Sequence, residues 1–267
     1  MARMPGGVFV KVTVCQFPED QERLAAHWRA LAEHVMAEAA DLVLLPEMPF
    51  SPWMARSPHV DPRIWAEAVA AHERWTARLG ELGARVVAGT SPILEGGIPY
   101  NQAFVWTEAE GCRPVHKKVF LPEEEGFWEA RWYRPGEPSF AVAESPLGRL
   151  GFLICTELWF GEWARFYGRQ GVRFLLCPRA TAMGSRDKWI AGGRTAAVMS
   201  GAFCLSSNRG GVDRHACSWA GTGWIIEPEE GDVLALTGAA SPFITLDLDE
   251  TVADRAKTTY PRYVRES

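Results

Sequence analysis

Short apolar runs rich in β-branched residues alternate along this chain with longer amphipathic segments, a pattern typical of α/β folds. Buried strands are predicted at residues 8–17, 41–46, 85–90, 149–154, 173–177 and 202–207. Helices are predicted at residues 19–40, 62–82 and 186–200. Such strand–helix–strand units favour one mixed sheet, or two, with helices on the outer faces.

Two hairpin patterns interrupt these units. One joins residues 102–107 to 112–117, and the other joins 140–143 to 149–154. Between them, residues 118–138 form a long loop rich in charge and tryptophan, and such loops usually carry function. Late strands are predicted at residues 224–226, 233–236 and 243–247. With neither a linker nor a repeat in the sequence, residues 1–267 are expected to form a single domain with a C-terminal extension at about 250–267.

Composition excludes several classes of function. Hydrophobic residues make up 47% and charged residues 23%, which suffices for a sizeable core. The net charge of −5 argues against nucleic acid or an anionic membrane as a partner. No apolar stretch is long enough to cross a membrane, and residues 1–7 lack the apolar part of a signal peptide. We therefore expect a cytoplasmic location. The six cysteines are scattered without a CxxC pair, which predicts reduced thiols and neither a disulfide framework nor a zinc site. No metal or organic cofactor is expected, since no cluster of ligand-type residues suggests one.

Cys155 stands where a predicted strand, residues 149–154, gives way to a predicted helix start at 156–165. A thiol at such a junction lies near the positive end of a helix dipole and beside free backbone N–H groups. That setting lowers the pKa of a thiol and favours the reactive thiolate. The alternative is a buried cysteine that only fills space. Other residues of the chain favour the first interpretation.

Three charged residues occupy positions of comparable interest. Glu47 ends the apolar run 41–46, where a carboxylate is costly to bury unless it is paired or protonated. Lys118 follows a hairpin strand, and Glu129 lies in the long loop. The ordinary alternatives are a glutamate facing solvent, a solvated basic cluster and a surface salt bridge, respectively.

The three motifs together resemble those of the nitrilase superfamily, the carbon–nitrogen hydrolases. In that family a glutamate follows Leu-Pro at a strand end, as in residues 44–47 (LLPE). Its lysine lies in a segment similar to 116–121 (HKKVFL), and its nucleophilic cysteine follows a strand similar to 151–155 (GFLIC). The order and spacing fit, and the resemblance extends over about residues 8–248.

The resemblance implies a four-layer αββα sandwich of two mixed β-sheets with helices on the outer faces. It implies that Cys155 attacks an amide carbonyl carbon and forms a thioester. Glu47 would act as general base and then as general acid. Lys118 and the backbone N–H of Thr156 would stabilise the oxyanion.

The family's further glutamate matches Glu129 by its distance from residues 135–136, and it would position Lys118 or the substrate nitrogen. Glu123, Glu124 and Glu125 compete for this role. One departure concerns the stretch after the nucleophile, where similar carbamoylases use arginines to hold a substrate carboxylate. Trp159 stands there instead, which disfavours a carbamoyl-amino-acid substrate.

The substrate is expected to be a small-molecule amide or nitrile, with an aromatic group as one possibility. Trp53, Trp128 and Trp159 are expected to line an apolar pocket suited to an aryl or arylalkyl amide, with simple packing as the alternative. Arg179, just after a strand, is expected either to bind a substrate carboxylate or to form a structural salt bridge. An amidase that releases ammonia and a carboxylic acid is favoured, while nitrile and N-carbamoyl or ureido substrates stay open.

Two rivals come from other classes. A cysteine protease would need a histidine beside Cys155, but no histidine lies in a recognisable catalytic segment. The histidines are His27, His34, His59, His72, His116 and His215. A catalytically inactive binding protein on the same fold would not need Glu47, Lys118 and Cys155 together.

Assembly as a homodimer, or as a higher even-numbered homo-oligomer, is the last expectation. Members of the family commonly pair through helices that follow the nucleophile. Here that helix carries an apolar face of Trp159, Trp163, Phe166 and Tyr167. The apolar tail at residues 258–264 is expected to cross to the partner.

Overall fold

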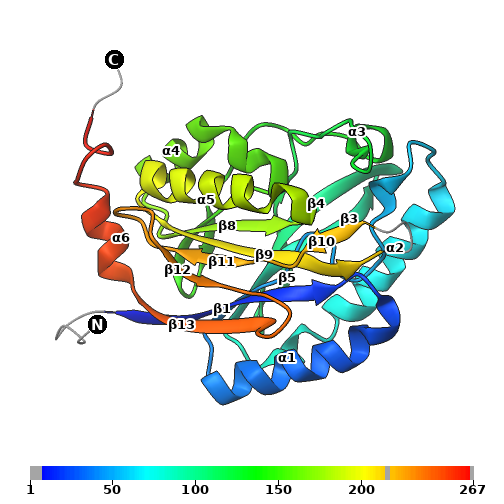
Figure 1. The fold of residues 1–267 in the computed structure, drawn as a ribbon, viewed down its shortest axis with the longest axis horizontal. Helices are drawn as coiled ribbons and strands as arrows, with labels where there is room; N and C mark the ends of the chain where they lie inside the picture. The colour runs from blue at the N-terminus through cyan, green and yellow to red at the C-terminus, as the bar shows by residue number, and fades with distance from the viewer. Residues whose placement is uncertain (1–7, 214–216, 265–267) are drawn as a thin grey trace.

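The computed structural model describes residues 8–213 and 217–264, and His215 lies outside them. Its strands form two mixed sheets that share β1 and pack face to face between helices (Figure 1). In order across the first sheet lie β5 (Gly111–Lys117), β4 (Ile98–Thr107), β3 (Val86–Glu95), β2 (Leu42–Leu44), β1 (Phe9–Pro18) and β13 (Phe243–Asp249). The strands β1, β2 and β3 are parallel, and the remaining pairs of this sheet are antiparallel.

The second sheet continues from the end of β1, whose residues 16–18 pair in parallel with β9. Its strands are β6 (Ala143–Ser145), β7 (Gly148–Phe152), β8 (Phe174–Arg179), β9 (Phe203–Val212), β10 (Ser218–Ala220), β11 (Trp224–Ile226) and β12 (Val233–Leu236). The strands β7, β8 and β9 are parallel, so the central strands of both sheets run in one direction.

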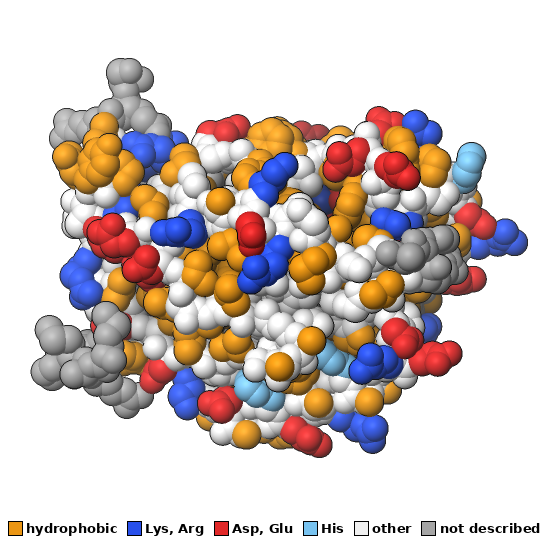
Figure 2. Space-filling model, viewed as in Figure 1, with side chains coloured by type: hydrophobic (Ala, Val, Ile, Leu, Met, Phe, Trp, Pro, Cys, Tyr) orange, Lys and Arg blue, Asp and Glu red, His pale blue; other side chains and the backbone are white. Residues whose placement is uncertain are grey.

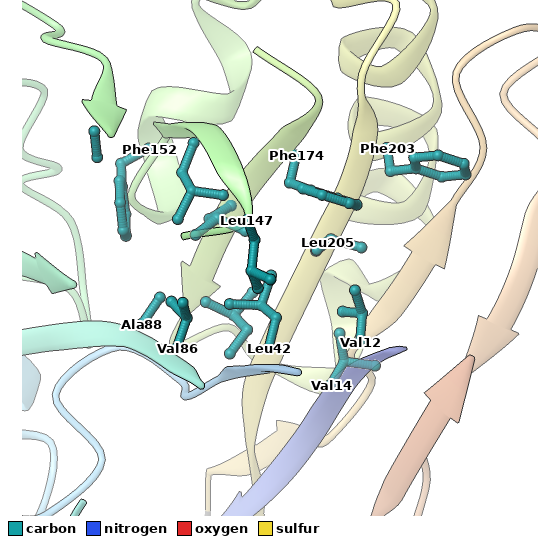
Figure 3. Packing of buried hydrophobic residues seen from close by; sticks show 14 of the residues in the cluster. Val12, Val14, Leu42, Val86, Ala88, Leu147, Phe152, Phe174, Phe203 and Leu205 are labelled. Carbon is teal, nitrogen blue, oxygen red and sulfur yellow. The ribbon is translucent and has the colours of Figure 1, made fainter. Parts of the chain in front are cut away.

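Alternation along the strands builds the layers, because successive side chains of a strand point to opposite faces. Leu42 and Leu44 face the other sheet, whereas Val43 and Leu45 face the outer helices. The inter-sheet core contains side chains from both sheets, such as Val12 from β1 and Phe152 from β7 (Figure 3). Both faces of the central strands are buried, which explains their continuous apolar runs.

Helices cover the two outer faces (Figure 1). The first sheet is covered by α1 (Leu24–Glu38) and α2 (Pro62–Thr76), and the second by α4 (Gly161–Arg169) and α5 (Arg186–Ser200). The short helix α3 (Glu129–Trp132) lies in the long loop, and α6 (Glu250–Ala256) follows β13. The predicted αββα sandwich is therefore confirmed. No helix in the described part of the chain has the length and apolar character needed to span a membrane.

The structure differs from the predicted elements in one hairpin and in several short pieces. The strands β3 and β4 pair over nearly their full lengths around a turn at Gly96 and Gly97, both with positive φ. The prolines at 92 and 99 had hidden this hairpin, since proline cannot donate to a sheet ladder. The predicted helix 19–40 begins only at Leu24, and β10, α3 and α6 were not predicted.

The expected interface helix buries most of its apolar face inside its own chain. Tyr167 is fully buried, and the Trp163 ring stacks on Phe140 with a centroid distance of 4.0 Å. Trp159 alone among the large side chains of that face is classed as exposed. The exposed apolar patch on this helix is thus smaller than the sequence predicts, because Phe140 and the second sheet cover most of its aromatic side chains.

The C-terminal tail, as far as Val264, is bound to its own chain. Arg262 donates hydrogen bonds to backbone oxygens of Ala256 and Val198, and Arg165 on α4 donates one to the backbone oxygen of Val264. The described tail therefore lies on α4, α5 and α6 of the same chain rather than extending away from it, contrary to the expectation of a tail that crosses to a partner.

Candidate active site

Three of the four candidate residues lie just after strands, and the structure brings them together with the fourth. Glu47 follows β2, Lys118 follows β5 and Cys155 follows β7, while Glu129 begins α3. Because these strands all run in one direction, their carboxyl ends open on the same edge of the sandwich. All four side chains are buried, with at most 3% of each residue exposed.

Lys118 lies between two carboxylates. Its Nζ is 2.9 Å from Oε1 of Glu47 and 2.5 Å from Oε2 of Glu129. Burial alone would lower the pKa of Lys118, but the charges of Glu129 and Glu47 outweigh it and raise that pKa. Lys118 is therefore a fixed positive charge in a water-poor site.

Each carboxylate has a second donor and one unused oxygen. Asn101 Nδ2 donates to Oε1 of Glu47 at 2.8 Å, and the Tyr133 hydroxyl donates to Oε2 of Glu129. The other oxygens, Oε2 of Glu47 and Oε1 of Glu129, are buried without a hydrogen-bond partner among the described residues. Burial raises the pKa of Glu129 to about 7, against the lowering effects of Lys118 and Tyr133. A buried acceptor without a donor is costly, so both oxygens are available to a reacting molecule.

Cys155 adopts a strained backbone conformation at the strand end. Its φ is +48°, in the left-handed region that a residue with a Cβ rarely occupies. The turn projects from β7 into a short 3₁₀ helix, Cys155–Trp159, rather than directly into α4. A strained residue held in this way is a common feature of functional sites.

The thiol of Cys155 differs from the sequence-based expectation. Burial and the negative charge of Glu47 raise its pKa, and neither Lys118 nor the N–H of Ala180 reverses this. The expected lowering by a helix dipole is wrong because the helix that starts here is one short turn and the thiol is desolvated. The resting side chain is therefore a thiol, and a base is required to make it a nucleophile.

A buried arginine fixes the turn that carries Glu47. Arg209 on β9 donates to the backbone oxygens of Glu47, Met48 and Ser51, and it pairs with Glu19 at 2.5 Å. Met48 has a φ of +41°, so the turn is strained next to Glu47. The arginine and its partners are separated by more than 150 residues in sequence, and no local pattern predicts this contact.

Sequence reasoning also missed Asn101 and Tyr133. For Tyr133 a signal exists, because it follows Glu129 by four residues, the spacing of neighbours on a helical turn. Asn101 lies within β4, in a segment of the β3–β4 hairpin that was not predicted. Glu129, rather than the exposed Glu123, Glu124 or Glu125, is the loop glutamate that reaches Lys118.

An aromatic cluster borders the four residues. The rings of Trp53, Phe127 and Trp219 form a triangle with centroid distances of 6.0–6.2 Å. The same buried cluster includes Met48 beside Glu47, Tyr133 bonded to Glu129, and Ala180 beside Cys155. Trp53 is thus placed next to the candidate site.

The other proposed binding residues lie differently. Trp128 is half-buried and stacks against Arg131. The Trp159 ring packs against Trp189 on α5 and is 43% exposed. The structure does not bring Trp159 into the aromatic cluster around Trp53.

Arg179 is committed to the protein interior. Its guanidinium donates to Ser206 Oγ at 2.7 Å, to Thr181 Oγ1 at 2.8 Å and to the backbone oxygen of Thr222, and it lies 3.8 Å from the Trp224 ring centroid. Burial lowers the pKa of Arg179 to about 10. These contacts are with hydroxyl and carbonyl oxygens, and none of them is with a carboxylate of the described residues. They favour a purely structural arginine.

Side chains of the kinds that bind metal ions are scattered through the described part of the chain. There, no group of three or more His, Cys, Asp and Glu side chains has an arrangement that could hold a metal ion. The charge in the site comes instead from Lys118 and its two glutamates.

Comparison with known proteins places this geometry in a family. The carbon–nitrogen hydrolase profile matches residues 11–257. A chloroplastic omega-amidase of Arabidopsis thaliana is 27% identical over 266 residues, covering 94% of this chain and 70% of that protein. An N-carbamoylputrescine amidase of Arabidopsis thaliana is 29% identical over 117 residues, covering 41% and 38%.

The fold has solved counterparts. A carbon–nitrogen hydrolase from Helicobacter pylori G27 superposes with a TM-score of 0.86 at 19% identity, covering 97% of this chain and 96% of that one. At 19% identity this similarity shows a shared fold, whereas the profile match extends over nearly the whole sequence. The chain belongs to the carbon–nitrogen hydrolase family and is a hydrolase of the amidase type.

Proposed function

We propose that this protein hydrolyses small uncharged amides to a carboxylic acid and ammonia, with Cys155 as nucleophile, Glu47 as general base and acid, and Lys118 as the oxyanion's positive partner. The observation that carries this proposal is the state of Glu47. One oxygen of its carboxylate binds Lys118, and the other is buried without a hydrogen-bond partner among the described residues. The nearby thiol of Cys155 has a raised pKa and needs a base to remove its proton. A thiol with a raised pKa and a neighbouring base fits a nucleophile that is activated only during reaction.

The first half of the reaction forms a thioester. Oε2 of Glu47 takes the thiol proton as Sγ of Cys155 bonds to the amide carbon, and the carbonyl oxygen becomes an oxyanion. Lys118 and the backbone N–H of Thr156 stabilise that charge. The first N–H groups of a helical turn have no partner within the turn, which leaves them available. The C–N bond then breaks as Glu47 returns the proton to the nitrogen, and ammonia leaves.

The second half of the reaction hydrolyses the thioester. Glu47 takes a proton from water, whose oxygen attacks the thioester carbon, and the carboxylic acid leaves as the proton returns to sulfur. Glu129 has a positioning role in this scheme, because its Oε2 holds Lys118 at 2.5 Å. Its free oxygen, Oε1, is available to an N–H of the leaving group.

The acyl side of the substrate is proposed to be apolar or aromatic. The buried aromatic cluster of Trp53, Phe127 and Trp219 is proposed as the wall of this acyl pocket, and Arg179 is already bound to protein oxygens. Apolar walls with a few polar groups are typical of pockets for uncharged ligands. An N-carbamoyl substrate is the second candidate, since a curated relative is an N-carbamoylputrescine amidase. A nitrile is the third, because it can use the same nucleophile.

A release assay separates these substrates. The purified protein is incubated with 3-phenylpropanamide, succinamate, phenylacetonitrile and N-carbamoylputrescine, and ammonia and carbon dioxide are both measured. We expect ammonia without carbon dioxide, fastest from the arylalkyl amide, and no release by a Cys155→Ala variant. Ammonia with carbon dioxide from the carbamoyl compound alone would overturn the amide assignment. Release from succinamate alone would overturn the apolar acyl pocket.

We propose that the protein works as a homodimer, or a higher even-numbered homo-oligomer, in the cytoplasm. Exposed apolar residues remain near α4 and the tail, namely Trp159, Tyr260, Tyr263 and Val264. In Figure 2 hydrophobic side chains gather at the end of the molecule where the tail lies. The six free cysteines, four of them buried, fit a reducing compartment. A monomeric mass by light scattering at micromolar concentration, with full activity, would contradict the dimer.

A further inference from the structure

The carboxylate of Glu157 is buried two residues after the nucleophile, and the mechanism above does not use it. It accepts hydrogen bonds from the backbone N–H of Ile154 at 2.8 Å and from that of Val119 at 2.7 Å. Nε2 of His116 lies 2.9 Å and 3.0 Å from its two oxygens. A single carboxylate therefore binds three donors from two chain segments.

The donors flank the reactive residues. Ile154 directly precedes Cys155, whereas His116 and Val119 stand on either side of Lys118. The first segment leaves the second sheet and the other leaves the first sheet. The Glu157 carboxylate is thus a direct link between the nucleophile turn and the lysine segment.

The bond to Ile154 also supports the strained backbone. The turn has a second hydrogen bond, from the Glu157 N–H to the Ile154 backbone oxygen at 3.1 Å. Together the two bonds close the turn that holds Cys155 at a φ of +48°. Strained residues persist only where their surroundings fix them. Hydrogen bonds to a buried charged group are among the strongest available for this.

We propose that Glu157 and His116 form a positioning pair that sets the distance between Cys155 and Lys118, and thereby places the oxyanion charge of the substrate opposite the ammonium group. The proposal rests on the proposed roles of Cys155 and Lys118. Neither residue of the pair touches the reacting atoms; both act through the backbone on either side of them. His116 carries a proton on Nε2, because that nitrogen faces two carboxylate oxygens.

Glu157→Gln tests the carboxylate. A glutamine can keep one acceptor, but its amide would place donors against the N–H groups of Ile154 or Val119. We expect kcat on 3-phenylpropanamide to fall about 10- to 100-fold with KM changed less than about threefold, since the lost bonds are to a charged acceptor. Glu144→Gln, at an exposed glutamate on β6, is the matched control and is expected to leave kcat unchanged.

Two histidine variants separate positioning from packing. His116→Gln keeps an N–H donor close to the position of Nε2, whereas His116→Phe keeps a ring against Phe140, 4.7 Å away, without the donor. We expect His116→Gln to retain kcat within about threefold and His116→Phe to lose about tenfold. A larger loss in His116→Gln than in His116→Phe would mean that the ring acts by packing and not through its N–H, and it would overturn the pair.

Alkylation of Cys155 by iodoacetamide, followed by mass spectrometry, gives a readout independent of the amide substrate. We expect Glu157→Gln to slow this alkylation about tenfold or more, while Glu144→Gln does not. A wild-type protein that hydrolyses none of the substrates, together with slowed alkylation in Glu157→Gln, would reject the proposed function and leave the pair supported. Glu157→Gln with wild-type alkylation and wild-type kcat would overturn the pair. If Glu157→Gln does not fold, the two histidine variants decide.

Discussion

The phenolic hydroxyl of Tyr133 donates a hydrogen bond to the buried carboxylate of Glu129, four residues earlier on one helical turn. The bond lowers the pKa of Glu129, which burial has raised to about 7. The charge state of this glutamate at neutral pH therefore depends on a tyrosine that sequence motifs do not reveal.

Tyr133→Phe tests this dependence. Loss of the donor raises the pKa of Glu129 further, so the carboxylate that holds Lys118 becomes protonated at higher pH. We expect the acidic limb of the kcat/KM profile to move up by about one pH unit, with the alkaline limb unchanged. Tyr260→Phe, at a tyrosine that is mostly exposed, is the control. An unmoved acidic limb would show that Glu129 need not be ionised.

Cys155→Ala is expected to leave the fold intact and to remove hydrolysis. The residue is buried in the inter-sheet core, but alanine is smaller than cysteine and fits there. Activity should fall below about a thousandth of the wild-type value, because loss of a covalent nucleophile removes the main route. The matched control is Cys112→Ala, at an exposed cysteine. Residual activity above that level, measured as ammonia release, would disprove the nucleophile.

Glu47→Gln and Lys118→Ala are each expected to reduce kcat by about 10³-fold or more without acting through stability alone. Either change combined with Cys155→Ala should add almost nothing, because the three groups act as a unit. Lys117→Ala is the control for the lysine, since this neighbour pairs with Glu95 outside the buried site. Additive losses would show that the groups work in separate steps, and thermal unfolding of each variant checks the fold.

His72 gives a prediction for stability against pH. Burial lowers the pKa of this histidine to about 3 in the folded protein, from an ordinary value of 6.5. The unfolded chain therefore binds a proton that the folded chain does not, and stability falls as pH decreases below about 6.5. Between pH 7.5 and 5.5 we expect a loss of about 1.4 kcal/mol from this residue.

His72→Gln should remove that part of the loss, as measured by urea unfolding at the two pH values. His59→Gln, at an exposed histidine, should behave as the wild type. If the wild type and His72→Gln lose the same free energy of unfolding between pH 7.5 and 5.5, His72 is not held neutral by burial.

The layers and the ends of the central strands were predictable because each is a local property. Apolar runs such as residues 41–46 and 149–154 predicted the buried strands. The residues that follow these two runs, Glu47 and Cys155, indicated the candidate site. The β3–β4 hairpin was not predictable, since two prolines and a Gly-Gly turn interrupt its apolar pattern.

The environment of the candidate site depended on distant contacts. The choice of Glu129 over its acidic neighbours follows from one helical turn in a loop, and the raised pKa of Cys155 follows from burial that no local motif encodes. Arg179 has the charge and the position after a strand that suit a carboxylate-binding residue, but Ser206, Thr181 and Thr222 bind its guanidinium. Interactions of this kind depend on how the second sheet is completed.

β1 belongs to both sheets, and Glu47 and Cys155 follow strands on opposite sides of it. The distance between the proposed base, Glu47, and the proposed nucleophile, Cys155, therefore depends on the thickness of the packed interior. It also depends on where β1 passes from the first sheet to the second. Side chains such as Val12 and Phe152, which touch no substrate, act as spacers for the chemistry. A gain or loss of volume in the apolar interior is consequently expected to shift one reacting group against the other, even though the substituted side chain lies outside the site.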